Sequence, residues 1–260
     1  MKRPCISADN VNFKFIIGFF IISFYMMATF ASAENREFIV GVENIEYYPH
    51  YDFTKENKGV AKRILDLFAQ SKNYHFKYRP LPVKRLFSEF VSLELDFKYP
   101  DHPLWQKEIK KNVKVIYSKP VVNIVAGTMV LPENVGRGID SFKTLGTVLG
   151  FTPFHWADLI ESKKIIIHED TDVGRLLLQA LMGRIDGADV ELSVANYHLR
   201  LLDKQGALLM DPNLPHLIAS FHLSTVTHPD IIKELNLFLM QNSSKIAKMK
   251  RQFYIRESID

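Results

Sequence analysis

Two acidic residues near Val190 could anchor a small polar ligand through a carboxylate. Glu191 follows a strand predicted at 185–190 and opens a helix predicted at 191–200. The positive end of the helix dipole favours the ionised carboxylate, so Glu191 could bind a ligand ammonium group; the alternative is a plain first-turn acid. Asp189 is the second choice for this role, and Asp186 is interpreted as structural.

An arginine and an aromatic residue offer two further kinds of contact. Arg85 lies in a proline-rich turn at 80–85 that leads into a helix, and its guanidinium could bind a carboxylate with two donors. A surface salt bridge is the alternative for that side chain. Trp105, which follows Phe97 and Tyr99, could stack on a flat or sugar-like ligand, with core packing as the alternative.

Catalytic and metal-binding patterns are missing from the sequence. Neither a Gly-x-Ser-x-Gly elbow, nor a P-loop, nor a His-Glu-x-x-His motif occurs. Six histidines show no metal-like pairing four residues apart: His155, His168, His198, His216, His222 and His228. His50 is interpreted as a loop residue. We therefore predict no catalytic residues, no metal site and no cofactor.

These residues lie in a chain where short apolar strands alternate with amphipathic helices. Strands are predicted at 38–42, 74–79, 113–117, 121–130, 144–149, 165–167, 185–190 and 221–226, with Pro80 breaking the second. Helices are predicted at 61–70, from Val83, from Pro153 with Thr152 as its cap, at 172–182 with Thr171 as its cap, at 191–200, at 229–240 and after Ser243 or Ser244. This alternation predicts an α/β fold with mostly parallel sheets.

The N-terminus has the three-part layout of a secretory signal peptide. A basic start is followed by an uncharged run of 16 residues at 15–30 and by Ala31-Ser32-Ala33. The apolar run is shorter than the roughly 20 residues of a membrane span, so cleavage after Ala33 is preferred over a retained anchor. The only cysteine, Cys5, would leave with the leader, which excludes disulfides and thiol chemistry in the mature protein.

The charge balance argues against nucleic acid as a partner. The whole chain carries +4, and the leader accounts for +2 of this, so the mature protein carries about +2. No dense patch of lysine and arginine with interleaved aromatics occurs. We expect a secreted protein that is monomeric and does not bind nucleic acid.

Four segments in order resemble the bacterial extracellular solute-binding proteins of family 3, the amino-acid-type substrate-binding proteins of ABC transporters. They are Tyr48-Pro49-His50-Tyr51 with Gly59, Val115-Ile116-Tyr117-Ser118-Lys119-Pro120-Val121, Gly183-Arg184-Ile185-Asp186-Gly187-Ala188, and the segment 224–254. The resemblance covers most of the chain after the leader. It implies a periplasmic binding protein fold of type II, with two α/β lobes joined by two crossing strands. Lobe one would comprise 34–123 and 221–260, and lobe two 124–220.

The resemblance also assigns ligand contacts. Tyr48 and Tyr51 fall where the family has aromatics beside the ligand, and Tyr47 is expected to face the other way. Ser118 lies in the strand end that precedes the crossing, and Glu191 matches the acid that pairs with the ligand ammonium. Thr152 lies in a turn that resembles the family's anion-receiving turn.

One departure from the family concerns the ligand carboxylate. The family usually carries a Thr-x-x-Arg before the first crossing strand, and its arginine holds the α-carboxylate of an amino acid. This chain has no arginine between Arg85 and Val121. Lys107 could replace it only as a point charge, without the two-donor fork.

Three functions are compatible with the sequence. The first is a periplasmic solute-binding protein that closes on an amino acid or related polar solute and delivers it to an inner-membrane ABC permease. The second is a ligand sensor that docks on a chemoreceptor or histidine kinase. The third is an enzyme of the prephenate dehydratase type, which would need a carboxyl group in the cleft as general acid, a role Glu191 could fill.

Overall fold

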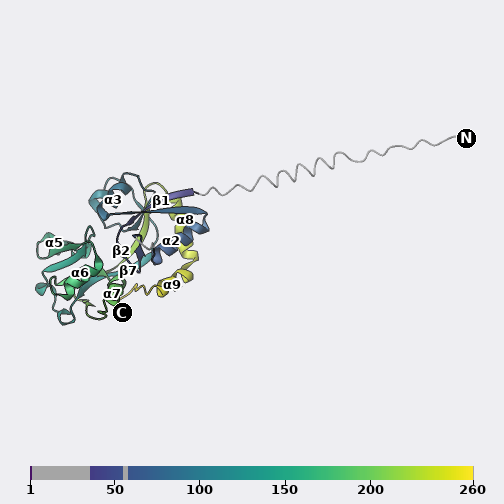
Figure 1. The fold of residues 1–260 in the computed structure, drawn as a ribbon. Helices are drawn as coiled ribbons and strands as arrows, with labels where there is room; N and C mark the ends of the chain where they lie inside the picture. Colours follow the sequence, from purple (N-terminus) through teal and green to yellow (C-terminus); the bar gives the residue numbers. More distant parts are fainter. Residues whose placement is uncertain (2–35, 55–57, 260) are drawn as a thin grey trace. The chain divides into compact units, whose positions relative to one another are not determined.

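Alternating strands and helices, as predicted, make up the computed structural model of the protein (Figure 1). It describes residue 1, residues 36–54 and residues 58–259. Apart from Met1, the predicted leader with Cys5 and the cleavage site after Ala33 lies outside the described residues. Within the described part of the chain, no helix is both long enough and apolar enough to cross a bilayer.

A mixed sheet runs through the fold. Its strands, in spatial order, are β4 (Tyr74–Leu81), β1 (Arg36–Glu43), β5 (Phe97–Asp101), β12 (Leu217–Thr225), β7 (Val122–Val130), β10 (Gly187–Glu191), β8 (Thr144–Val148) and β9 (Ile166–Asp170). Two short strands add to it, β6 (Ile116–Tyr117) beside β12 and β11 (Leu209–Met210) beside β7. A separate hairpin consists of β2 (Glu46–Tyr47) and β3 (Tyr51–Asp52).

Strand β12 connects the two halves of this sheet. It pairs with β7 from Leu217 to Phe221, and with β5 at His222 and Ser224, where the register shifts. Parallel pairs join β1 with β5 and β8 with both β9 and β10, whereas β10 pairs antiparallel with β7 and β12 antiparallel with β5. The prediction of mostly parallel sheets is wrong in the middle, because β7 and β12 run between the halves in opposite directions and pair antiparallel.

Helices flank the sheet in both halves. They are α2 (Val60–Ser71), α3 (Val83–Val91), α4 (Lys107–Lys110), α5 (Ala157–Glu161), α6 (Val173–Leu181), α7 (Leu192–Leu201), α8 (Pro229–Gln241) and α9 (Ser243–Gln252). Short 3₁₀ turns occur at η1 (Pro132–Asn134), η2 (Ile139–Ser141) and η3 (Phe154–Trp156). Helix α2 packs on β4, and α6 packs on β8 and β10.

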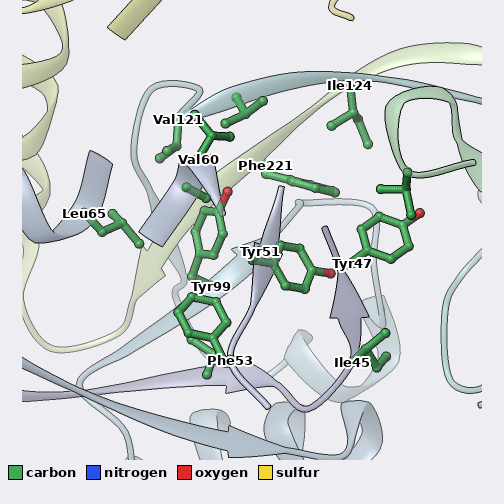
Figure 2. Packing of buried hydrophobic residues seen from close by; sticks show 14 of the residues in the cluster. Ile45, Tyr47, Tyr51, Phe53, Val60, Leu65, Tyr99, Val121, Ile124 and Phe221 are labelled. Carbon is green, nitrogen blue, oxygen red and sulfur yellow. The ribbon is translucent and has the colours of Figure 1, made fainter. Parts of the chain in front are cut away.

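The apolar spacing of α2 shows how the sequence selects its buried face. Val60, Ile64, Leu65 and Phe68 recur every three or four residues and are all fully buried. Figure 2 shows Val60 and Leu65 in the same core as the ring of Phe221 from β12. Each such aliphatic or aromatic side chain contributes about 1.5–3 kcal/mol by leaving water, so this face holds the helix on the first half of the sheet.

Three local predictions differ from the structure. Strand β4 continues through Pro80 to Leu81; it is the first strand in the sheet order, and an edge strand tolerates the missing amide donor. Thr152 does not cap a helix, because Pro153 precedes a 3₁₀ turn that begins at Phe154. Asp172 caps α6 in place of Thr171, since its carboxylate accepts the amide of Arg175 at 2.7 Å.

Candidate functional site

A cavity lies where several strands of both halves end. It holds about 660 Å³ of empty space, which includes open solvent at its mouth. Its walls are mainly aromatic and aliphatic with a few acidic groups: Glu43, Tyr47, Tyr51, Val83, Phe87, Trp105, Ile124, Ala126, Gly150, Phe151, Thr152, Pro153, Phe154, His155, Asp189, Glu191, Ala219 and Phe221.

The position of the cavity follows from the sheet topology. Glu43 is the last residue of β1 and Glu191 the last of β10, while Gly150 lies two residues beyond the end of β8. The carboxyl ends of strands in α/β sheets form a crevice where the strand order reverses. Ala126 of β7 and Ala219 of β12 contribute to the wall from the crossing strands, and their small side chains leave room there.

Glu43 is a buried carboxyl in the cavity wall, 1% exposed. The hydroxyl of Tyr51 donates a hydrogen bond to its Oε2. Burial raises the pKa of Glu43 to about 7, against the opposing effects of the Lys98 ammonium and the Tyr51 hydrogen bond. Near neutral pH this group therefore exchanges between its charged and neutral forms.

A buried network of charges links β5 to β12 near this carboxyl. Lys98 and Asp101 are both fully buried, with 3.6 Å between the ammonium and the carboxylate. Asp101 also accepts from Lys110 at 3.2 Å and from the Ser224 hydroxyl at 2.7 Å. Desolvation lowers the pKa of both lysines, and Asp101 opposes that shift. The network fixes these charges within the fold.

Glu191 is held by partners within the protein. As N-cap of α7 it accepts the amide of Val194 at 2.9 Å and the hydroxyl of Ser193 at 3.1 Å. His50 places Nε2 2.8 Å from its Oε2, and both side chains are at most 1% exposed. His50 lies in the turn between β2 and β3, as predicted, and it is in addition a buried partner of the cavity acid.

Asp189 and His155 form a second acid–histidine pair in the cavity. Nε2 of His155 lies 3.0 Å from Oδ1 of Asp189, and the side chains are 9% and 10% exposed. Nδ1 of His155 is buried and has no hydrogen-bonding partner among the described residues. A pair in which one nitrogen is left unsatisfied inside a cavity is well suited to receive a ligand group.

Four of the residues predicted as ligand contacts line the cavity, namely Tyr51, Trp105, Thr152 and Glu191. They come from β3, from the segment after β5, from the loop after β8 and from the end of β10, so the fold brings together positions far apart in sequence. Asp186, interpreted as structural, accepts the amides of Lys143 and Thr144 at 2.8 and 2.7 Å.

The other four predicted contacts lie outside the cavity lining, and their ligand roles stay predictions. Tyr48 packs on Tyr197 with 4.4 Å between ring centroids. Arg85 donates from Nε to Glu89 at 2.6 Å, the surface salt bridge considered above.

The remaining two are Lys107 and Ser118. Lys107 is exposed at the start of α4. Ser118 joins two segments, because its hydroxyl accepts the amide of Leu223 at 3.1 Å.

Tyr47 lines the cavity, contrary to the prediction that it faces away. In the hairpin, Tyr47 and Tyr51 are directly paired, and cross-strand partners share one face. Their rings are stacked with centroids 5.5 Å apart, and Figure 2 shows the two side chains next to each other. The hydroxyl of Tyr47 accepts the amide of Glu191 at 3.1 Å, which ties the hairpin to β10.

Sequence reasoning missed Glu43 and His155 as cavity residues. Glu43 directly follows the strand predicted at 38–42, so the signal that selected Glu191 was present there too. His155 carries no such signal, because its pairing with Asp189 spans 34 residues. Within the part of the chain that the structure describes, no cluster of His, Cys, Asp and Glu suits a metal ion.

Solved structures share this fold. A histidine kinase sensor domain with similarity to periplasmic binding proteins superposes with a TM-score of 0.70 at 13% identity, over 86% of this chain and 99% of that domain. An arginine periplasmic binding protein from Legionella pneumophila gives 0.66 at 13% identity, over 84% and 100%. An ancestral amino acid-binding protein, a precursor of cyclohexadienyl dehydratase, gives 0.65 at 18% identity, over 84% and 95%.

These superpositions confirm the predicted fold class: the chain has a periplasmic-binding-protein-like α/β fold. At such identities they establish the fold alone. Comparison of the sequence with protein-family models and with curated proteins gives no match.

Proposed function

We propose that this chain is a periplasmic solute-binding protein that captures a small polar ligand between two lobes. The lobes are residues 34–123 with 221–260, and residues 124–220. The observation that supports this best is the cavity, which is lined from both lobes and from both crossing strands. Its aromatic walls and few buried polar groups have the composition of a small-molecule site.

Binding would couple to a hinge motion at the crossing strands. β7 and β12 pair along 122–126 and 217–221, and the register of β12 shifts between His222 and Ser224. A few residues at such a position can absorb the backbone change of a domain closure. Tyr51, Trp105, Thr152 and Glu191 are the contacts we assign to the bound state.

The destination of the ligand separates two forms of this proposal. In the first, the closed protein delivers its solute to an inner-membrane ABC permease; in the second, it docks on a chemoreceptor or histidine kinase. Both a transport-system binding protein and a kinase sensor domain share the fold. Uptake of the identified ligand by cells with and without the gene distinguishes them, since only the first form predicts loss of uptake.

Secretion is part of the proposal. Cleavage after Ala33 would release a periplasmic protein that starts at Glu34. Mass spectrometry of the protein from a periplasmic extract is expected to give that N-terminus. Recovery of the intact chain in the membrane fraction would contradict it.

Thermal unfolding against a ligand panel tests the binding function. The panel comprises amino acids, amines, sugars, dipeptides and organic acids, added to protein purified after expression of the full chain. A ligand at a hundred times its dissociation constant stabilises by about 2.7 kcal/mol, a shift of several degrees.

A cavity-filling variant supplies the control. Ala126→Leu places three extra carbon atoms in the cavity wall and should abolish the shift. Ala247→Leu makes the same change on α9, outside the cavity lining, and this variant should still show the ligand-induced shift in unfolding temperature. If no compound shifts the unfolding temperature, or if Ala126→Leu responds like the wild type, the cavity is not the binding site.

An enzymatic function of the dehydratase type is the second candidate, and Glu43 is the observation that favours it. A buried carboxyl with a pKa of about 7 is suited to act as a general acid near neutral pH. Conversion of prephenate-type substrates by the wild type, lost in Glu43→Gln, would establish this reading. If a ligand binds but no product forms from these substrates, the result would support the binding function and contradict the enzymatic one.

A further inference from the structure

The charges around the cavity are arranged for a cationic ligand. Three carboxyl groups line it, from Glu43, Asp189 and Glu191, whereas no lysine or arginine of the described residues does. A ligand carboxylate would enter this acidic, largely apolar space without an opposite charge. Burying an unpaired charge costs several kcal/mol, so such a ligand would be disfavoured.

The nearest cations are already held by the protein. Lys98 donates to the carbonyl of Pro100, lies 3.6 Å from Asp101, and is fully buried beneath the surface. Lys110 donates to Asp101 at 3.2 Å, to the carbonyl of His102 at 2.7 Å and to the hydroxyl of Tyr117 at 2.9 Å. Neither lysine is placed to receive the carboxylate of an amino acid.

The loop after β8 is also not an empty cradle for an anion. The amide of Gly150 donates to Glu169, that of Phe151 to the carbonyl of Val148, and that of Phe154 to the carbonyl of Thr152. The amide group of the Gln106 side chain lies 3.4 Å from the hydroxyl of Thr152. The groups that would bind an anion there are largely occupied.

Asp189 is the carboxylate best placed for a ligand cation. Glu191 already has His50, Ser193 and Val194 as partners. Asp189 pairs through Oδ1 with Nε2 of His155, and its Oδ2 has no partner among the described residues. With the proton on Nε2, the buried Nδ1 of His155 is a second acceptor without a partner in the described chain.

Aromatic rings supply the remaining wall. The ring centroids of Trp105 and Phe221 lie 5.7 Å apart in an edge-to-face arrangement. Phe154 lines the cavity from the loop after β8. Ring faces attract cations and also bury apolar groups, so they suit the body of an amine as well as its charged end. An organic acid would bring a further negative charge to the three carboxyl groups, and a sugar carries no positive charge to pair with them.

Resting on the proposed function, we propose that the ligand is a small organic amine without a carboxylate. Its ammonium group binds Asp189, and its apolar body lies against Trp105, Phe154 and Phe221. The site should therefore bind an amine more tightly than the amino acid that differs from it only by a carboxylate.

Matched pairs of compounds test this assignment. Isothermal titration is done with tyramine against tyrosine, cadaverine against lysine, and agmatine against arginine, which differ in each pair by the carboxylate. At least one amine is expected to bind more than about tenfold tighter than its amino acid, since an unpaired buried carboxylate costs more than 1.4 kcal/mol. Asp189→Asn should weaken that amine by about tenfold or more, because it removes a charge-assisted hydrogen bond.

The control variant is Asp140→Asn, which makes the same charge change on an exposed residue of η2 and should leave the affinity unchanged. Two results would overturn the amine assignment: equal or tighter binding of the amino acid, or an amine affinity that Asp189→Asn does not change. Both results would still agree with the proposed binding function. Tight binding of only sugars or organic acids does the same. If no compound of any class binds, both the assignment and the proposed function fail.

Discussion

Replacing Glu43 by glutamine removes a cavity carboxyl group whose pKa lies near neutral pH. Burial raises the pKa of Glu43 from 4.5 to about 7, so the folded protein holds this proton more tightly than the unfolded chain does. A group with this shift stabilises the fold below pH 4.5, and that contribution is lost as pH rises through 7. The free-energy difference that corresponds to these two pKa values is roughly 3 kcal/mol.

Urea unfolding at pH 5, 6, 7 and 8 measures this loss. The difference between wild type and Glu43→Gln in the free energy of unfolding should change by about 2.5 kcal/mol from pH 5 to pH 8, in favour of the variant at high pH. Glutamine keeps a carbonyl acceptor for the hydroxyl of Tyr51, so the hydrogen bond can persist.

The matched control is Glu46→Gln, which changes an exposed carboxylate on the neighbouring hairpin. Its unfolding free energy should follow the wild type at every pH. Parallel profiles for wild type and Glu43→Gln would refute the reasoning, because they would mean that Glu43 holds its proton equally in both states.

Three further predictions follow from the structure. Gly59→Ala should lower the free energy of unfolding more than Gly183→Ala does, because a Cβ on Gly59 would lie 2.5 Å from Cα of Tyr51, whereas a Cβ on Gly183 would meet open space. Gly59→Ala should also weaken ligand binding, since Tyr51 lines the cavity. Urea unfolding measures the first effect and ligand titration the second. Amine affinity should rise by up to about tenfold from pH 6 to pH 8, because a bound cation interacts more favourably with the ionised form of Glu43. Lys98, Tyr51 and Asp101 also influence the pKa of this carboxyl group. Isothermal titration with the amine at each pH measures the effect, and the affinity of Glu43→Gln should change less with pH. Leu65→Ala should destabilise by about 2–5 kcal/mol, because Leu65 is fully buried on α2, and a loss below 1 kcal/mol would contradict its place in the core.

Much of the fold could be predicted from periodicity. The apolar positions of α2 and the sequence from Pro229 define helices whose observed bounds differ from the predicted ones by one residue at most. Strand ends were less accurate, as at β9, which begins at Ile166 and continues to Asp170 beyond the predicted 165–167. The buried residue of the apolar run, Ile165, precedes β9, and pairing with β8 extends the strand through the polar residues that follow the run.

The candidate site was predictable only in part, for reasons of local geometry. The hairpin strand β2 is two residues long, so alternation along it could not decide between Tyr47 and Tyr48; the pairing of Tyr47 with Tyr51 decides it. The close pairings of His50 with Glu191 and of His155 with Asp189 join residues from separate elements. Such pairings depend on the packing of the two halves, which no spacing in the sequence records.

Fluorine NMR of protein labelled with 5-fluorotryptophan would test the central claim most directly, because the chain has two tryptophans in different environments. Trp105 lines the cavity, whereas Trp156 is fully buried against Phe142 in a separate core cluster. Titration with tyramine, cadaverine or agmatine is expected to move the Trp105 resonance saturably and leave that of Trp156 in place. A Trp105 resonance that stays fixed while a ligand binds would contradict the cavity as the binding site.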